Sequence, residues 1–221
     1  MVATVSKVVL VLGSVCLLAG CSPGASQSRP PDIANVAEVK STFGPEFKVS
    51  EIPPRAIDPQ FFAARKLPEG LRFDPANCAK AALGPQLPAG LEGNMAAVSA
   101  EGNGNRFVVI AVETSQALPS NDPGEECAKV AFSGAGVRGG IEVIEAPHIE
   151  GVQTRGVHRV LQALVDGSAH TGELYDYSAQ SGDYQVNVIA NPLVVPGQQV
   201  APVDTNRARD LLVKAVTAVL G

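Results

Sequence analysis

Hydrophobic and polar positions alternate near the end of the chain, between residues 184 and 191. Because successive side chains of a strand point to opposite faces, this pattern predicts a strand with one face on the core and the other in water. Residues Phe107–Val112 are all apolar and predict a central strand covered on both faces. The inward residues expected in the later strand are Tyr184, Val186, Val188 and Ala190, and the outward residues are Gln185, Asn187 and Asn191.

Similar short runs of apolar and β-branched residues, separated by glycine-rich turns, predict further strands of an antiparallel sheet. The sharpest turn signal is Gly102–Asn105, between two such runs. The first strand should end at Pro53-Pro54, because proline cannot donate to a ladder. The expected strands are Phe47–Ile52, Met95–Ala100, Arg106–Thr114, Lys129–Phe132, Gly140–Glu145, Thr154–Val165, Glu173–Ala179 and Asp183–Ala190.

Helical spacing appears at the two ends of the region that follows residue 32. Asp32 is placed to cap a short helix that stops at Gly44-Pro45, and Asp58-Pro59 and Asp74-Pro75 resemble helix starts. The closing helix, capped by Asp204 or Thr205, carries one apolar stripe that should lie on the sheet. We therefore predict one α+β domain over residues 33–221, an antiparallel sheet with helices packed on one face, including the C-terminal helix. Its stripe consists of Leu211, Leu212, Ala215, Val216 and Val219.

The first twenty residues have the layout of an export signal. Lys7 precedes the apolar run Val8–Ala19, which is too short for a membrane span of about 20 residues. The run ends in Leu18-Ala19-Gly20-Cys21, which matches the lipobox of bacterial lipoproteins. We expect residues 1–20 to be a signal peptide and Cys21 to carry the lipid anchor; an ordinary signal peptide or a transmembrane helix is the alternative.

Residues 21–32 are rich in serine, proline and glycine and are expected to form a flexible tether. Removal of the signal takes away one basic residue, Lys7, so the formal charge falls from −5 to −6. A negative balance without basic clusters argues against nucleic-acid binding and against electrostatic adhesion to lipid. Membrane attachment would then come from the acyl chains, on the extracytoplasmic side of the cell membrane.

Two of the four cysteines remain once Cys16 leaves with the signal and Cys21 is acylated. Cys78 and Cys127 in an exported domain predict a disulfide. They are 49 positions apart, and closing a loop of that length stabilises the folded state by about 4 kcal/mol in the chain-entropy model. The alternatives are a reactive thiol, for which no histidine lies nearby in sequence, and a metal site, for which the paired spacing of zinc ligands is missing.

Candidate catalytic chemistry is sparse. The sequence has no Gly-x-Ser-x-Gly, Ser-x-x-Lys or His-Glu-x-x-His motif, and we expect no enzyme activity, no cofactor and no metal. His148, His158 and His170 are expected on a loop, a strand and a turn, so they should not converge. Tyr175 and Tyr177 face the same side of one strand and are weak candidates for stacking on a ligand, with packing at the edge of the core as the alternative.

Five parts of the sequence occur together in a characteristic order: Phe43–Val49, Asp74–Ala79, Cys127, Ala146–Thr154 and Asp210–Val216. In these segments the chain resembles a group of actinobacterial, mainly mycobacterial, lipoproteins with an uncharacterised domain. That group is in turn loosely similar to the extracellular sensor domain of a mycobacterial serine/threonine kinase. The resemblance covers residue 33 to the end and implies a bridge between Cys78 and Cys127, an envelope location and no established activity.

Two functions remain open from the sequence. The first is a lipoprotein whose non-catalytic domain binds an envelope protein or a small ligand, on the concave side of the sheet or at the proline-rich segment 53–93. The second is a carrier that holds a lipid or another apolar molecule between sheet and helix. A carrier needs a large apolar cavity, whereas aromatic residues make up only 5% of the chain.

Overall fold

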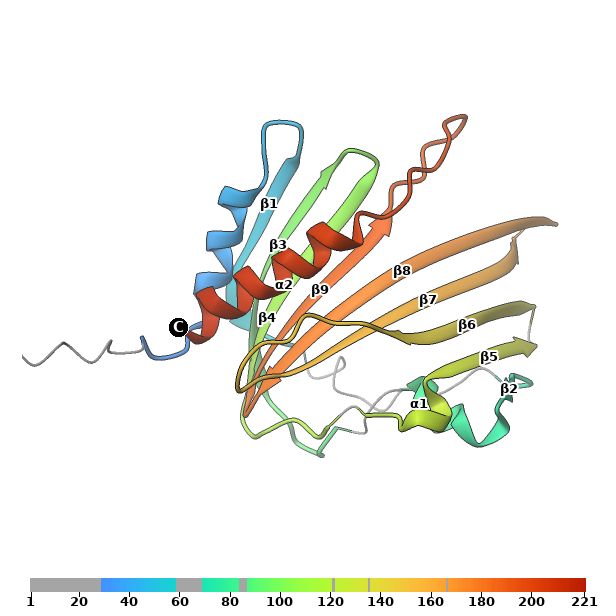
Figure 1. The fold of residues 1–221 in the computed structure, drawn as a ribbon, viewed down its shortest axis with the longest axis horizontal. Coiled ribbons are helices and arrows are strands. Elements are labelled where there is room, and N and C mark those ends of the chain that lie inside the picture. The colour runs from blue at the N-terminus through green and yellow to red at the C-terminus, as the bar shows by residue number, and fades with distance from the viewer. Residues whose placement is uncertain (1–28, 59–68, 84–86, 121, 135, 166) are drawn as a thin grey trace, which may run out of the picture.

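The computed structural model describes residues 29–58, 69–83, 87–120, 122–134, 136–165 and 167–221. They form one antiparallel sheet of nine strands in the order β1-β3-β4-β9-β8-β7-β6-β5-β2, which twists strongly from one edge to the other (Figure 1). The strands are β1 (Lys48–Ala56), β2 (Arg72–Asp74), β3 (Gly93–Gly102), β4 (Asn105–Thr114), β5 (Lys129–Gly134), β6 (Val137–Ile144), β7 (Gln153–Val165), β8 (Ser168–Ser181) and β9 (Tyr184–Pro192).

Two helices cover one face of the β1-to-β8 half of the sheet. The C-terminal helix α2 (Thr205–Leu220) contacts β4, β9 and β8, and the 3-10 helix η1 (Ile33–Thr42) contacts β1, β3 and β4 (Figure 1). Aspartate caps both helices: Asp32 accepts a hydrogen bond from the backbone N–H of Ala34, and Asp204 accepts one from Arg207. The expected α+β fold with a C-terminal helix is confirmed.

The main core lies between these helices and the sheet. All five predicted stripe residues of α2 are buried. Opposite them lie the alternate, inward residues of the central strands, such as Val109 in β4 and Val188 in β9, which are fully buried. Phe43, Phe47 and Phe107 form an aromatic cluster at one end, with ring centroids 5.1–6.2 Å apart. The alternation read along residues 184–191 therefore correctly separates the core face from the outer face.

A second, smaller core lies on the other face of the sheet, beside β5 and β2. Cys78 and Cys127 form a disulfide there, with Cα atoms 5.5 Å apart, and pack with Val130 and Phe73. The ring of Phe132 lies over Gly139, where an added Cβ would come within 2.5 Å of the ring. The short helices that bring the cysteines together are η3 (Ala76–Cys78), α1 (Ala79–Leu83) and η4 (Glu125–Cys127).

Several local expectations are wrong in detail. β1 continues through Pro53-Pro54 to Ala56, because it is an edge strand and its register shift between Ile52 and Arg55 accommodates the prolines. Asp74 ends β2 instead of capping a helix, and the residue before η3 is Pro75, with no side-chain cap. His170 lies in β8, not in a turn, because the β7–β8 hairpin is longer than expected. The helix start expected at Asp58-Pro59 falls at the boundary of residues outside the described part.

The strand Phe107–Val112 is fully covered on one face only. Phe107, Val109 and Ala111 are buried under the helices, whereas Val108 and Ile110 on the other face are partly exposed. The face of the sheet that no helix covers is therefore partly exposed to solvent along β4.

The folded body begins before the helix start at Asp32. The guanidinium of Arg29 donates a hydrogen bond of 2.7 Å to the carbonyl of Ala218, and the backbone N–H of Asp32 donates to the carbonyl of Val219. Residues 29–32, which composition assigns to the tether, are thus fastened to the last turn of α2.

We predict that Leu212→Ala lowers the free energy of unfolding by about 2–5 kcal/mol, because the Leu212 side chain is fully buried between helix and sheet. Chemical denaturation followed by circular dichroism measures the effect. The matched control is Val213→Ala in the next position, where the side chain is 39% exposed and the loss should be well under half as large. Equal losses in the two variants would contradict the packing of α2 on the sheet.

Candidate functional site

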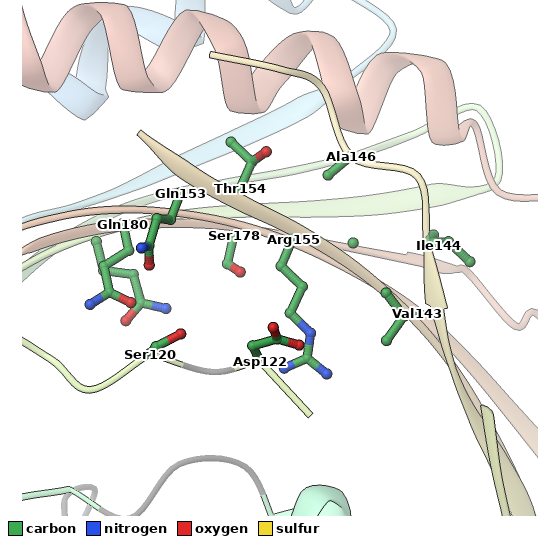
Figure 2. Close-up of a pocket in the computed structure, with 12 residues that line it drawn as sticks. Ser120, Asp122, Val143, Ile144, Ala146, Gln153, Thr154, Arg155, Ser178 and Gln180 are labelled. Atoms are coloured by element: carbon green, nitrogen blue, oxygen red, sulfur yellow. The ribbon is translucent and has the colours of Figure 1, made fainter. Parts of the chain in front are cut away.

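A cleft of about 500 Å³ lies on the face of the sheet that α2 does not cover. Its walls come from β7, β8 and β9 and from the loop that follows β4, and Figure 2 shows the Arg155 side chain extending from its strand away from the helix, whereas Thr154 points toward the helix. A small apolar rim is formed by Val143, Ile144 and Ala146. The polar lining residues are Ser120, Asp122, Gln153, Thr154, Arg155, Ser178, Gln180 and Gln185.

Strand register explains why these polar residues meet. Gln153 of β7 is opposite Gln180 of β8, which is opposite Gln185 of β9, so three glutamines form a row across three strands. In the next row, Arg155 is opposite Ser178. Each position is two residues from its neighbour in the other row, and the side chains therefore share one face.

The loop after β4 forms the other wall of the cleft. Thr114, 4% exposed, fixes the start of the loop, since its hydroxyl contacts the carbonyls of Gln116 and Asp183 at 2.9 Å. Farther along, Gln180 Nε2 donates a hydrogen bond of 2.6 Å to the carbonyl of Leu118. The loop ends at η4 and Cys127, so the disulfide fastens its far end.

Charges in and beside the cleft are balanced. Burial lowers the pKa of Arg155, and the nearby positive charge of Arg159 lowers it further, whereas the carboxylates of Asp176 and Asp122 raise it. Two arginines and two aspartates therefore act on one another in this region. The cleft offers amide, hydroxyl and paired charged groups, which suits reversible binding of a polar ligand.

The two tyrosines proposed from the sequence lie on the opposite face, under or beside α2. Tyr177 is 2% exposed and belongs to the main core, so a ligand could reach its ring only by displacing that core. Tyr175 is partly buried and stacks on His158, with ring centroids 4.3 Å apart. Their shared side of one strand is correctly predicted, but the structure joins neither to the cleft.

None of the three histidines is among the described residues that line the cleft. His158 in β7 lies on the helix-side face and contacts Glu173 Oε1 through Nε2 at 2.9 Å, and the Tyr175 hydroxyl donates to the same oxygen at 3.0 Å. His148 lies in the loop between β6 and β7, and His170 near the start of β8. Across the described segments, no three His, Cys, Asp or Glu side chains are grouped so that they could hold a metal ion. Within the same segments, no helix combines the length and apolar character of a membrane span.

Sequence reasoning missed the cleft because its residues are ordinary outward positions of strands. The alternation along β9 predicts that Gln185 lies on the outer face of the sheet, and the structure places it there. The sequence does not reveal the strand order. That order places β7, β8 and β9 side by side and brings Gln153 and Gln185 into one row across the sheet. A sequence signal for the cleft does exist: polar residues at positions 180–185, around the β8–β9 turn, and Gln153 at the start of β7. Gln153 pairs with Gln180, which in turn pairs with Gln185.

All three tyrosines should ionise above their ordinary pKa. Burial raises the pKa of Tyr175 and of Tyr177, and the hydrogen bond from the Tyr184 hydroxyl to Glu113, 2.9 Å long, raises the pKa of Tyr184 to about 12. The neutral phenols are favoured in the folded state, so their contribution to stability is present below pH 10 and is lost as the pH rises toward 12.

Absorbance at 295 nm measures this titration cleanly, because the chain has three tyrosines and no tryptophan. We expect little phenolate at pH 10 in the folded protein and half-ionisation near pH 10 after denaturation in urea. Tyr184→Phe should remove the component with a pKa of about 12. Half-ionisation of all three phenols at pH 10 in the folded protein would contradict these environments.

The chain belongs to the family described as the domain of unknown function DUF5642, whose profile matches residues 32–220. A solved structure from Mycobacterium smegmatis, described as an uncharacterised ortholog of Rv0999, is 55% identical, with a TM-score of 0.79 over 86% of this chain and 98% of that one. Membership of a family with an uncharacterised domain, expected from the sequence motifs, is thus confirmed.

A more distant similarity joins the chain to the extracellular domain of PknH from Mycobacterium tuberculosis. The identity is 14% and the TM-score 0.41, over 86% of this chain and 92% of that one. This agrees with the loose likeness to a kinase sensor domain seen in the sequence, and it is too low to inform function. No curated protein matches the chain.

Proposed function

We propose that this protein is a cell-envelope lipoprotein, anchored through acylated Cys21 on the extracytoplasmic side, whose domain binds a polar ligand without catalysis. The observation that carries the proposal is the cleft of about 500 Å³ on the helix-free face of the sheet. Its volume lies within the range of small-molecule sites, and most of its polar groups come from the strands β7, β8 and β9.

The chemistry of the lining supports binding rather than turnover. Catalysis by a serine requires a base within hydrogen-bond reach, and the two cleft serines have no histidine among the described lining residues. Both remaining cysteines are joined in the disulfide. The proposal therefore assigns the cleft the role of a receptor for an envelope component.

The carrier alternative is less well supported. A lipid carried between sheet and helix would need space where Phe107, Leu211 and Leu212 are packed with at most 1% of their surface exposed. Apolar cargo would also have to avoid the polar groups of the cleft. Binding on the helix-free face requires neither change.

The test is native mass spectrometry of the full-length protein, extracted in detergent from its own cell envelope. We expect a bound mass beyond the acyl chains in the wild type, and its loss in Ser178→Phe, where a bulky ring would fill the cleft. The matched control is Ser168→Phe, at the exposed start of the same strand, which should keep the bound mass. If extraction of the wild type yields only the acylated chain, or if Ser178→Phe keeps its occupant, the cleft is not the binding site.

A further inference from the structure

The cleft has the chemistry of a site for an uncharged, polyhydroxylated molecule, and we infer that its ligand is a neutral saccharide. This inference rests on the proposed binding function and names the class of ligand. It depends on three observations: the charge balance of the cleft, the free hydrogen-bonding groups in its lining, and its apolar rim.

Charge balance disfavours an anion. A site for a phosphate or a carboxylate needs positive charge in excess, as in arginine clusters that form bidentate pairs. Here the electrostatic partners of Arg155 are one further arginine, Arg159, and two aspartates, Asp122 and Asp176. A bound anion would meet the aspartates as well as the arginines, whereas a neutral hydroxyl could donate to the first and accept from the second.

The lining offers groups that both donate and accept. In the described part of the chain, the side chains of Gln153, Ser120 and Ser178 form no hydrogen bond with another residue. An amide supplies two N–H donors and a carbonyl acceptor, and a serine hydroxyl can play either role. A sugar hydroxyl is also both donor and acceptor, so adjacent hydroxyls on a ring match adjacent amides and serines along the strands.

The rim supplies the apolar contact that a sugar ring also requires. Val143 near the end of β6 faces the cleft, whereas Ile144 and Ala146 border it at one side and pack against the main core (Figure 2). The carbon-bound hydrogens on one face of a pyranose ring could pack there while its hydroxyls face the glutamine row. A cleft of about 500 Å³ is large enough for a short saccharide.

Isothermal titration calorimetry with the detergent-solubilised full chain tests the inference. The neutral probes are maltotriose, cellotriose and mannotriose; the anionic probes are trigalacturonate and inorganic phosphate. We expect at least one neutral trisaccharide to bind and the anions to bind at least tenfold more weakly. Ser178→Ala and Gln153→Leu should each raise its Kd about threefold to tenfold, the effect of one lost hydrogen bond.

The matched control is Gln199→Leu, an exposed glutamine in the loop before α2, which should leave the Kd unchanged. Failure of all three neutral probes to bind, tighter binding of an anion, or an equal effect of Gln199→Leu and Gln153→Leu would overturn the saccharide inference. None of these results would contradict the proposed function. That function is tested separately, by whether Ser178→Phe loses the ligand that the wild-type protein retains when it is extracted from the cell envelope.

Discussion

Replacing Cys21 by serine is expected to move the protein from the membrane fraction to the aqueous fraction. Acylation forms a thioether on the cysteine sulfur, and the serine hydroxyl cannot take part in that reaction. Cleavage after Gly20 would remove Lys7 and change the formal charge from −5 to −6, and a net negative chain is not attracted electrostatically to anionic lipid in place of the acyl chains. Phase separation in a detergent that forms two phases on warming measures the partition.

The matched control is Cys16→Ser, another cysteine of the N-terminal stretch that the lipobox does not use. It should partition with detergent like the wild type. Detergent partitioning of Cys21→Ser that equals that of Cys16→Ser would exclude lipidation at Cys21. Mass spectrometry of the detergent-phase protein would also show whether two acyl chains are present, since one chain holds a protein only weakly.

Removing the disulfide is expected to lower the free energy of unfolding by about 2–5 kcal/mol. The bond joins Cys78 and Cys127 across a sequence separation of 49, and without it the unfolded chain gains the freedom of that loop. The double variant Cys78→Ala/Cys127→Ala avoids leaving a reactive thiol. Thermal unfolding monitored by circular dichroism should show a fall of several degrees in the melting temperature.

Addition of a reductant to the wild type should reproduce the shift, and the same reductant should have no effect on the double variant. Equal melting temperatures with and without the bond would show that it contributes no stability. If the reductant lowers the melting temperature of the wild type but the double variant melts at the same temperature as the untreated wild type, the reductant acts through something other than the disulfide.

The sequence predicts β9 and α2 well because their buried residues recur at the spacing of a strand and of a helix. In β9 the inward residues Val186, Val188 and Ala190 are all buried, and the stripe of α2 is buried in full. The cysteines could be paired by elimination, since only two remain for the folded domain. Each of these predictions depends on local periodicity or on counting, which need no knowledge of strand order.

The cleft could not be predicted in the same way, because it depends on which strands are neighbours. Gln153 and Gln185 are separated by β8, and nothing local to either residue places them in one row. Tyr175 and Tyr177 are candidates for ligand binding from the sequence because aromatic side chains often stack on ligands. The side of the strand that Tyr177 shares with Tyr175 is the side that α2 covers, and the core therefore takes the ring of Tyr177.

If Cys21 is acylated, the attachment of Arg29 to the last turn of α2 limits how far the folded body can stand from the membrane. With acyl chains on Cys21, only residues 21–28 separate the lipid from the folded body, a span of at most about 29 Å. β8 has 14 residues and therefore runs for about 46 Å. The β7–β8 hairpin points away from the end where both the start of the body and the C-terminus lie (Figure 1). The exposed Leu161 and Leu164, near the tip of this hairpin, would then lie far from the anchored end of the molecule.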